Sequence, residues 1–582
     1  MADDGALREG LERYALDNAL KHEGKASEKA VMGKIMAERA DLRARSKELM
    51  AMLAEIVAQV NAMSPSGQQA RLDQLGAVVV HERKRREGLQ ELLGAVPVAD
   101  GGKGVVMRLA PGPSGPLHLG HSRMAILNDE YVRNYGGKLI DRLEDTDVER
   151  ILPEAYDWIP EDIEWLGVKV HETVRQSDRF AIYMDIAKQL VAQGAAYVCT
   201  CQIEGWKELL NASRPCVHRG QGPDVQMGEW EKMVDGTYAE GQAVLVIKTD
   251  LGHKNPAVRD WYAMRIVDNV PHPLTGSRYR IYPLMNFSVA VDDHLMGMTH
   301  VLRGKDHLNN THRQEYLYDH LGWPKPVFLH YGRVTIEDIQ LSKRKILAGI
   351  QAGEYTGWDD VRLGTLRAMR RRGIRPEAIR KYWVDAGVKQ VDITFSWMNL
   401  YAANKDIIDP ESDRLFFVWD PVALTIEGAP SGLESRAPRH PDHPERGQRT
   451  FQVTSEGVLV TREDFSSMKV GDIVRLKDLC NVEVLNLVRE GEGPMIAGTR
   501  YAGNSLDVLK KGARIIHWVH PSCNIDLKVL MPDGTIRTGK CEQFPLATEK
   551  GRRRVVQFER FGFVNLIPIE GSKGYDCIFT HT

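Results

Sequence analysis

Two short motifs carry residue types suited to chemistry on a phosphorylated substrate. The first reads Pro116-Leu117-His118-Leu119-Gly120-His121 and follows a loop rich in Gly and Pro. If His118 and His121 lie in the first turn of a helix, both imidazoles fall on one side of it and can donate hydrogen bonds to phosphate oxygens. The free backbone N–H groups and the dipole of that helix favour an anion at the same end. The motif therefore predicts an anion site, although in isolation it is more typical of a packed helix start.

The second motif, Gln340-Leu341-Ser342-Lys343-Arg344-Lys345, combines a hydroxyl with several cations. A mobile loop of this composition can close over the β- and γ-phosphates of a nucleotide and neutralise the charge that develops as pyrophosphate leaves. Alone, such a run is usually a solvated basic turn. Because it accompanies the first motif, we interpret it as the second half of a nucleotide site.

Three cysteines and a histidine form a third pattern, Cys199-Thr200-Cys201 followed by Cys216-Val217-His218. Zn²⁺ prefers four tetrahedral sulfur or nitrogen ligands, and two short ligand pairs across a loop supply them. Seven cysteines in 582 residues are too few for a disulfide framework. The pattern predicts a structural zinc site at Cys199, Cys201, Cys216 and His218. The alternative is three reduced cysteines and a surface histidine.

A strongly basic stretch runs from 358 to 383. It contains Arg362, Arg367, Arg370, Arg371, Arg372, Arg375, Arg380 and Lys381. Such a run is either a solvated helix face or a contact for nucleic-acid phosphates.

The elements that must position these motifs follow from the surrounding pattern. Residues 105–109 form a short β-branched strand, a Gly/Pro loop follows, and a helix beginning near Leu119 runs to Gly136-Gly137 before a second strand at 139–143. Strand, glycine-rich loop, helix and strand predict a βαβ unit with a parallel sheet. Further strands are expected at 299–303 and 326–331, so this α/β domain is interrupted between about 196 and 261.

The two ends of the chain have different periods. Leu49, Leu53, Ile56 and Val60 line one face of a predicted helix, and the sequence SPSG at 64–67 breaks the pattern as a turn. We interpret this region as a helical domain packed on itself, with a docking surface for RNA or protein as the alternative. The sequence DGGKG at 100–104 is a plausible hinge.

Beyond about residue 400 the hydrophobic period changes to two. Residues 525–529 alternate, Pro532-Asp533-Gly534 supplies a turn, and 535–538 can return as the partner strand. With further strands at 515–519 and 555–558, this region predicts one or two antiparallel barrels or sandwiches.

Composition narrows the class of protein. At 582 residues, with 43% hydrophobic and 27% charged residues, the chain can form several folded domains. No apolar run approaches the ~18–20 residues of a membrane helix, and the acidic start MADDGALREG is unlike a signal peptide. The net charge of −2 excludes a general polycation. We expect a cytoplasmic protein without membrane contact, and a monomer by default.

The two phosphate motifs resemble the HIGH and KMSKS motifs of class I aminoacyl-tRNA synthetases, and the residues around them resemble glutamyl-tRNA synthetases in particular. Arg108–Gly115 resembles the RFAPxPxG loop of that family, and Arg142–Asp147 resembles its RxEDTD segment. Val291–Gly297 with His300–Gly304 resembles VDDHLMGxTHVxRG. The β-rich tail, with Ile516–Val519, resembles the barrel-type anticodon domains of archaeal glutamyl and of glutaminyl enzymes. The resemblance covers most of the chain and favours the archaeal type.

The resemblance implies an α/β fold with a defined order of domains. A Rossmann-type catalytic domain at 101–345 would be interrupted by an acceptor-binding insertion at 196–261 that carries the zinc knuckle. An N-terminal helical domain would occupy 1–100, a helical stem-contact region 346–400, and antiparallel β-barrels for anticodon binding 401–582.

The resemblance also implies an activity. Glutamate would be activated by ATP with Mg²⁺ to glutamyl-adenylate and then transferred to the terminal adenosine of tRNA-Glu. If tRNA-Gln is loaded as well, an amidotransferase partner would have to correct it. The alternatives are a glutaminyl-tRNA synthetase and a catalytically inactive tRNA-binding paralogue. The first would read DDTN where this chain has Glu144-Asp145-Thr146-Asp147, and largely intact motifs oppose the second.

Site residues follow from the same resemblance. Arg108 and Arg303 would bind the glutamate carboxylates and Glu144 its ammonium group. The catalytic residues would be His118, His121 and Lys343. ATP would contact Pro116, Leu117, Leu119, Gly120, Leu341, Ser342 and Arg344. The tRNA would contact Arg367, Arg370, Arg371, Arg372 and Arg375.

Two departures from the family pattern stand out. Met285 occupies the position where the family usually has Tyr in the segment Pro283–Phe287, and Met cannot donate the hydrogen bond of a phenol. Gln340 and Arg344 replace the outer lysines of the second motif, while Lys343 keeps the central charge.

Overall fold

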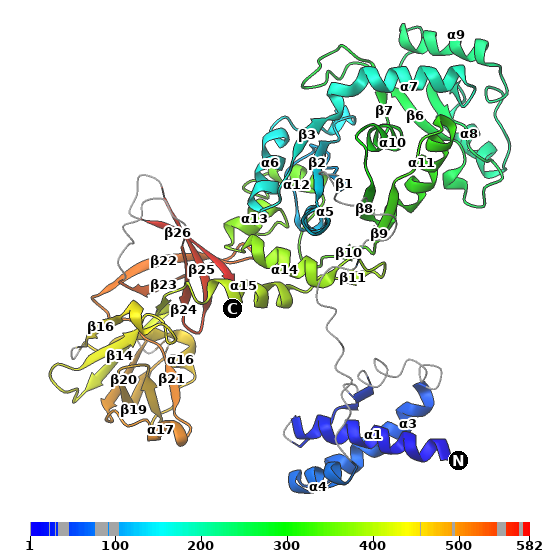
Figure 1. Ribbon diagram of the computed structural model, residues 1–582. Coiled ribbons are helices and arrows are strands. Elements are labelled where there is room, and N and C mark those ends of the chain that lie inside the picture. The colour runs from blue at the N-terminus through cyan, green and yellow to red at the C-terminus, as the bar shows by residue number, and fades with distance from the viewer. Residues whose placement is uncertain are drawn as a thin grey trace. The chain divides into compact units, whose positions relative to one another are not determined.

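The computed structural model divides the chain into two compact units, Met1–Glu87 and Gly88–Thr582 (Figure 1). The structure describes residues 2–21, 24–28, 31–32, 46–75, 91, 104–453, 456–489, 491, 495–543, 554–569 and 574–582. Of the expected hinge at 100–104, only Gly104 lies within these residues.

The described part of the first unit is helical. Its helices are α1 (Ala2–Lys21), α3 (Ser46–Asn61) and α4 (Pro65–Leu75). The predicted apolar face of α3 is fully buried and packs with Leu11 and Leu16 of α1, because spacings of three and four residues place its side chains on one stripe. Pro65 is the first residue of α4, so the predicted break at 64–67 is shorter than a full turn segment.

A parallel sheet forms the centre of the second unit. Its strands, in spatial order, are β3 (Glu172–Arg175), β2 (Gly137–Leu143), β1 (Val105–Leu109), β8 (His300–Gly304) and β9 (Val327–Tyr331). The N–H of Thr299 donates to Val106 O at 3.0 Å and brings β8 beside β1. The predicted strands and the βαβ unit with its crossover helix α5 (Leu119–Tyr135) are confirmed.

Helices of the 343–408 region pack onto α5 and its neighbour α6 (Ala155–Trp165) (Figure 1). They are α12 (Lys343–Gln351), α13 (Leu366–Arg371), α14 (Pro376–Ala386) and α15 (Trp397–Ile408), with a short parallel pair between β10 (Val334–Thr335) and β11 (Ile393–Thr394). The indole N–H of Trp383 in α14 donates to Ser122 Oγ in α5 at 2.8 Å. The guanidinium of Arg123 donates to the carbonyls of Gly332 and Gly387. These contacts fix α5 against the 343–408 region.

The interruption of the α/β domain is an antiparallel sheet with helices around it. Its strands are β4 (Ala196–Cys199), β5 (Val244–Ile247), β6 (Trp261–Ile266) and β7 (Ile281–Pro283), and its helices are α7 (Phe180–Ala192), α8 (Ile203–Asn211) and α9 (Pro223–Val234). Because β7 pairs with β6, this sheet extends beyond the predicted limit of 261. The chain then returns through α10 (Met285–Leu295) and α11 (Leu308–Leu321).

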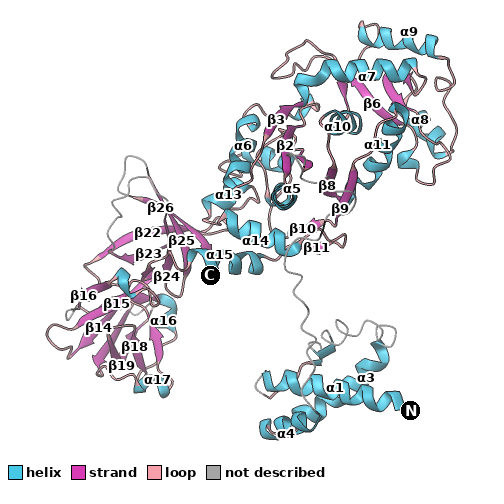
Figure 2. Cartoon of the chain, in the orientation of Figure 1, coloured by secondary structure: helices cyan, strands magenta, loops and turns pink. Residues whose placement is uncertain are grey.

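The C-terminal region is rich in strands (Figure 2). A seven-stranded sheet contains β12 (Arg414–Leu415), β24 (Arg554–Phe558), β25 (Gly562–Pro568), β26 (Tyr575–His581), β22 (Asn524–Leu530), β23 (Ile536–Glu542) and β13 (Phe417–Trp419). A six-stranded sheet contains β17 (Val458–Thr461), β14 (Pro421–Glu427), β20 (Ile496–Tyr501), β19 (Cys480–Val488), β18 (Ile473–Leu476) and β21 (Arg514–Ile516). Smaller elements are the pair β15 (Glu434–Pro438) and β16 (Gln448–Gln452), α16 (Arg462–Ser466) and α17 (Asp507–Lys510).

Both large sheets curve toward closure. β12 and β13 are separated by Phe416 alone yet lie at opposite edges of the seven-stranded sheet, so one continuous segment contributes to both edges. A bridge between Leu459 and Val519 links the two sides of the six-stranded sheet. The predicted hairpin at 525–538 is present, with Gly534 at φ +85° in its turn.

The expectation of purely antiparallel barrels is wrong. The pairs β12–β24, β22–β26, β14–β20 and β18–β21 are parallel, and each joins strands distant in the sequence. Alternating hydrophobicity indicates a strand but says nothing about its partner, which explains the error. In the described part of the chain, no helix is both long and apolar enough to cross a membrane.

Asp141 is an unusual residue in the central sheet. It lies on β2 between Leu139 and Leu143, is 1% exposed, and its Oδ1 has no hydrogen-bond partner among the described residues. Burial raises the pKa of Asp141 to about 7, because the charged form loses its hydration. An unfolded Asp titrates near 3.9. Between about pH 4 and pH 7 the folded state therefore binds more protons than the unfolded state, and stability falls as pH rises through this window.

We expect Asp141→Asn, which removes the charge and keeps the shape, to stabilise the α/β domain at pH 8 by a few kcal/mol, at about 1.4 kcal/mol per pKa unit. At pH 4.5 the variant and the wild type should differ little. Thermal unfolding at both pH values measures this, with the exposed Asp157→Asn in α6 as the matched control. An equal shift in Tm at both pH values would contradict the role of ionisation.

Candidate active site and metal site

The two histidines of the first motif cap the N-terminus of α5 reciprocally. His118 is the N-cap residue, and its Nδ1 accepts a hydrogen bond from Gly120 N at 3.1 Å. The Nδ1 of His121 accepts one from His118 N at 3.2 Å, and the two rings stack with centroids 3.7 Å apart. The side chains thus hold the helix start while the rings stay together on one side of it, as the motif predicted.

The protonation of these rings follows from their surroundings. Burial and the nearby Lys343 charge lower the pKa of His118 to about 3, and burial also brings the pKa of His121 well below its usual value. Both imidazoles are therefore neutral at pH 7. Because each Nδ1 accepts a backbone N–H, the ring proton must lie on Nε2. The site thus presents two neutral N–H donors that can bind phosphate oxygens.

Lys343 brings the second motif to the first. It is the first residue of α12, and its Nζ donates to the carbonyls of Gly115 at 2.8 Å and Gly112 at 3.3 Å. Burial lowers the pKa of Lys343 to about 8, an effect that the Asp162 carboxylate opposes, so the ammonium is mostly charged at pH 7. Gln340 Oε1 accepts the N–H of Ser342 at 3.0 Å, a structural use for the residue that replaces the family lysine.

Three of the remaining predicted ATP contacts, Pro116, Leu117 and Leu119, have side chains that are buried in the α/β domain. Any contact of theirs with ATP would come from the backbone. Asp162 of α6 holds this backbone, because its Oδ2 accepts the N–H of Leu117 at 2.8 Å. Sequence reasoning missed Asp162, which lies outside every motif.

Arginine and carboxylate side chains gather where the strands of the parallel sheet end. Arg108 on β1 and Arg142 on β2 both donate to Asp293 Oδ1 on α10, at 3.2 and 2.7 Å. Arg142 also donates to Glu144 Oε1 at 3.1 Å. The predicted glutamate-binding residues Arg108 and Glu144 are thus joined through Arg142 and Asp293. Arg142 and Asp293 lie within motifs recognised in the sequence, but no role was assigned to them there.

Arg303 on β8 completes this group. Its guanidinium donates to Thr311 Oγ1 at 2.6 Å and Gln314 Oε1 at 2.8 Å, and lies over the ring of Phe328. Burial and the Arg108 charge lower the pKa of Arg303 to about 10, which leaves it charged at pH 7. The three residues predicted to bind glutamate lie close enough for their charges to interact.

The ionisation of the buried carboxylates in this group depends on the guanidinium groups beside them. Burial opposes the ionisation of Asp293, but Arg108 and Arg142 outweigh it and hold its pKa below the usual range. Burial raises the pKa of Glu144, and Arg142 opposes that shift. The members are Arg108, Arg142, Arg179, Arg303, Glu144, Asp292 and Asp293, with Arg179 paired to Asp292 at 2.7 Å. Within this group Arg303 donates only to the neutral Thr311 and Gln314 and has no ion pair among the described residues, so its guanidinium suits a carboxylate of a ligand.

Met285 lies at the start of α10 with its side chain 37% exposed. It borders a cavity of about 620 Å³ and a second one of about 300 Å³, the latter also lined by Thr146 and Asp147. Met285 therefore lies beside the segment Glu144–Asp147, which contains one of the residues predicted to bind glutamate. Its thioether donates no hydrogen bond.

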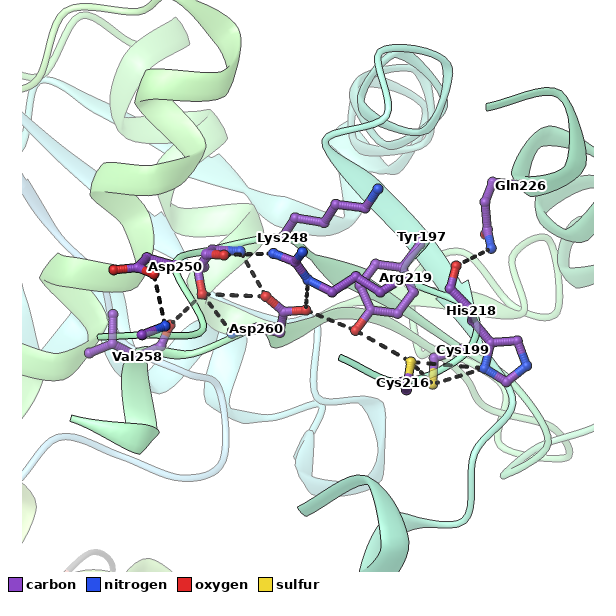
Figure 3. A network of polar contacts seen from close by, with 12 residues as sticks. Tyr197, Cys199, Cys216, His218, Arg219, Gln226, Lys248, Asp250, Val258 and Asp260 are labelled. Carbon is purple, nitrogen blue, oxygen red and sulfur yellow. Dashed lines mark hydrogen bonds and ion pairs between the residues drawn. The ribbon is translucent and has the colours of Figure 1, made fainter. Parts of the chain in front are cut away.

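The predicted metal ligands lie together in the insertion (Figure 3). Cys199, Cys201, Cys216 and His218 offer four ligand atoms, all within 4.8 Å of one another. The Sγ atoms of Cys199 and Cys216 are 3.8 Å apart, and His218 Nδ1 lies 3.4 to 4.0 Å from the three sulfurs. Zn–S bonds of about 2.3 Å and Zn–N bonds of about 2.0 Å place tetrahedral ligands about 3.5 to 3.8 Å apart. The donor set and its spacing therefore fit Zn²⁺.

Surrounding polar groups orient this cluster. Thr200 Oγ1 lies 3.0 Å from Nε2 of His218, which leaves Nδ1 directed at the sulfurs. Tyr197 donates to Asp260, which also pairs with Arg219 at 2.9 Å, so the loop that carries the ligands is tied to β4 and β6 (Figure 3).

The basic stretch at 358–383 is largely ion-paired within the fold. Arg367 pairs with Glu161, Arg371 with Asp359 at 3.5 Å, and Arg375 with Glu411 at 2.8 Å. Arg370 is exposed on α13.

Arg372 is 3% exposed, and its guanidinium donates to Tyr401 Oη at 2.8 Å and Thr580 O at 3.2 Å. The predicted contact of Arg372 with tRNA is therefore wrong, because a side chain used to join α13 to α15 and β26 is unavailable to phosphate.

The match to known protein families agrees with this site. Residues 104–410 match the model of the catalytic domain of class I tRNA synthetases (E and Q), and residues 412–500 match the corresponding anticodon-binding domain. The chain belongs to this family of class I tRNA synthetases.

Among the chain's relatives, the protein of Methanopyrus kandleri is named glutamate–tRNA ligase, is 45% identical and aligns over 100% of both chains. Proteins of the same name from Methanothermobacter thermautotrophicus (47% identical, 95% of this chain and 96% of that one) and Methanocaldococcus jannaschii (46%, 99% and 100%) are similar over nearly their whole length. Within the family of class I tRNA synthetases (E and Q), these relatives all carry the name of the glutamate enzymes.

Metal analysis of the purified protein should find about one zinc per chain. Cys201→Ser removes one sulfur and should reduce the zinc content well below one, because three ligands hold Zn²⁺ less tightly than four. Cys523→Ser, a free cysteine outside the cluster, is the matched control and should leave the content unchanged. Well under one zinc per wild-type chain would refute the site.

Proposed function

We propose that this chain is a glutamate–tRNA ligase that activates glutamate with ATP and transfers it to the terminal adenosine of tRNA-Glu. The observation that carries this proposal is the buried arginine group, in which Arg303 has no ion pair among the described residues, near the helix start with the neutral His118–His121 pair. Glutamate carries two carboxylates and one ammonium, hence one net negative charge. The near full-length similarity to glutamate–tRNA ligases supports the same conclusion.

In the first step, an α-carboxylate oxygen of glutamate attacks the α-phosphorus of ATP, and the bond to pyrophosphate breaks. Mg²⁺ enters with ATP and neutralises part of the phosphate charge. The Nε2–H groups of His118 and His121 would donate to phosphate oxygens, and the dipole of α5 favours an anion at this end. The ammonium of Lys343 would balance the charge that grows on the leaving pyrophosphate. No side chain acts as a nucleophile. Catalysis rests on alignment and charge stabilisation.

In the second step, the 2′-hydroxyl of the terminal adenosine attacks the carbonyl carbon of glutamyl-adenylate, loses its proton, and AMP leaves. Arg108 and Arg303 would hold the glutamate carboxylates and Glu144 the ammonium group. Guanidinium suits this task because it binds a carboxylate with two parallel hydrogen bonds.

The alternatives fit less well. Glutamine has one carboxylate where glutamate has two, so one of the two arginines proposed to bind carboxylates, Arg108 and Arg303, would lack its ligand. An inactive paralogue would not need the capped helix start and Lys343 held together. Neither alternative is favoured by the relatives, which carry the name glutamate–tRNA ligase.

For tRNA, we assign the barrels at 401–582 to the anticodon arm and the insertion to the acceptor end. Arg367, Arg370, Arg371 and Arg375 remain proposed phosphate contacts, and Arg370 is the most exposed of them. We expect a cytoplasmic monomer, and an amidotransferase partner if tRNA-Gln is charged as well. Zinc would hold the insertion in shape and take no part in the chemistry.

Charging of labelled glutamate onto purified tRNA-Glu and tRNA-Gln tests the function, with glutamine as the control amino acid. We expect Glu-tRNA-Glu and no charging with glutamine. Glutamate on both tRNAs would indicate relaxed anticodon recognition and require the amidating partner. Charging with glutamine instead, or no charging at all, would contradict the proposal.

Arg370→Gln and Arg372→Gln should differ in effect. Losing one phosphate contact should raise the KM for tRNA several-fold for Arg370→Gln at low salt, and the difference should shrink at higher salt. Arg372→Gln removes buried contacts and should lower Tm instead. Lys381→Gln, from the same basic stretch but paired with Asp385, is the matched control. An unchanged tRNA KM for Arg370→Gln at low salt would contradict the proposed contact.

A further inference from the structure

Arg303 differs from the other arginines at the strand ends, because each partner that it has among the described residues is neutral. The other arginines of the group donate to carboxylates, as Arg142 does to Asp293 at 2.7 Å. Arg303 is 6% exposed, and its Nη2 donates to Gln314 Oε1 at 2.8 Å and Thr311 Oγ1 at 2.6 Å. Because a buried charge normally needs an ion pair, the pairing of Arg303 is incomplete in the protein alone.

Two side chains of β9 next to these partners are uncharged as well. The Nε2 of His330 lies 2.9 Å from Thr311 Oγ1, and burial lowers the pKa of His330 to about 4, so its imidazole is neutral at pH 7. The ring of Phe328 packs against the guanidinium, with its centroid 5.1 Å from Cζ of Arg303. Thr311, Phe328 and His330 therefore add no negative charge beside Arg303.

Two carboxylates lie close enough to influence the charge of Arg303, but both are paired with another guanidinium group. Asp293 Oδ1 accepts from Arg142 at 2.7 Å, and Glu144 Oε1 accepts from the same side chain at 3.1 Å. Neither carboxylate forms an ion pair with Arg303. The positive charge of Arg303 thus stays available within a buried site.

Gln314 on α11 is the partner that could most simply have carried the missing negative charge. Its side chain is fully buried, and its Oε1 must face Arg303 because a guanidinium group has donors only. Its Nε2 has no hydrogen-bond partner among the described residues. A Glu side chain differs from Gln at that atom alone, so a carboxylate at position 314 would fit the same space and break no hydrogen bond of the described structure. An amide at this position leaves Arg303 without a counter-charge.

We propose that Gln314 is a positioning residue that fixes Arg303 through a neutral hydrogen bond and so leaves its positive charge free for a carboxylate of the substrate. This inference rests on the proposed function, because the free charge matters only if glutamate binds at Arg303. An amide oxygen restrains the guanidinium group without neutralising it. An ionised carboxylate at position 314 would instead form a buried ion pair, and a substrate carboxylate would have to compete with it.

Glutamate-dependent ATP–pyrophosphate exchange by the full chain, with tRNA present, measures the consequence of this charge. Gln314→Glu keeps the size of the side chain and an acceptor for Arg303, and adds a negative charge that the neighbouring guanidinium group keeps ionised. Because Arg303 is then already paired, the glutamate KM should rise about tenfold or more, whereas kcat should stay within about threefold. A general structural defect would instead lower Tm and reduce kcat as well.

Asn309→Asp is the matched control for the added charge. Asn309 is exposed on the same helix, and its Oδ1 accepts from Asn255 Nδ2 at 2.8 Å, a hydrogen bond that an Asp side chain can also accept. The control adds one negative charge to α11 at a position where solvent screens it. Its glutamate KM should therefore stay within about twofold of the wild-type value.

A second variant, Gln314→Met, separates the hydrogen bond from the charge. Met has a similar size and its thioether is only a weak acceptor, so Thr311 would hold a guanidinium group whose charge is still free. The glutamate KM should rise about threefold, less than for Gln314→Glu, with kcat largely unchanged. Gln314→Met also tests the positioning role if Gln314→Glu does not fold.

Three results would overturn the proposal, provided that the wild type is active. They are a wild-type glutamate KM for Gln314→Glu, a KM for Gln314→Met that rises as much as that of Gln314→Glu, and an unchanged KM for Gln314→Met. A wild type without glutamate-dependent exchange would overturn the proposed function itself.

Discussion

The constraint on which the rest of this structure depends is that the Nε2 donors of His118 and His121, at the start of α5, must be held in place without a covalent or metal link. A helix start has free N–H groups that water would otherwise satisfy, and two of them are taken by the rings of His118 and His121. The same two rings remain available as Nε2 donors. One pair of side chains thus caps the helix and, in the proposed mechanism, would bind the anion.

Side chains and backbone groups from several segments hold the start of α5 in place. Asp162 holds Leu117 from α6, the segment around Gly364 holds it from the opposite side, and Arg123 and Ser122 anchor the following turn to the α14 region. These contacts come from segments far apart in the sequence. Rigid donors lower the cost of reorganisation when charge moves to the leaving group, so the packing contributes directly to the chemistry.

The sequence predicted those parts of the fold that depend on residues close together along the chain. The strands at 105–109 and 139–143 and the start of α5 are set by a β-branched run, a Gly/Pro loop and capping residues. The four residues of the candidate metal cluster could be recognised in the sequence because zinc sites need short, fixed spacings. By contrast, β7 is a three-residue strand defined only by its pairing with β6, and the parallel pairs of the barrels join strands distant in sequence. No local period contains that information.

The adjacent arginines of the basic stretch show the same limit of prediction from sequence for single side chains. Arg370, Arg371 and Arg372 are neighbours of identical type, yet the first is exposed, the second is ion-paired and the third is buried against Tyr401 and Thr580. The partners of Arg372 lie 29 and 208 residues away along the chain, so the sequence could not separate it from its neighbours and all three were assigned to tRNA. At the strand ends the reverse holds. Arg142 lies within a motif already noted, but its role appears only once Asp293 is seen to bind both it and Arg108. A buried guanidinium therefore acquires its meaning from its partners. Arg123 and Arg372 donate to carbonyl and hydroxyl oxygens that join elements of the fold. Arg303 lies instead beside the buried ion pairs at the strand ends, where the proposed substrate would supply a carboxylate.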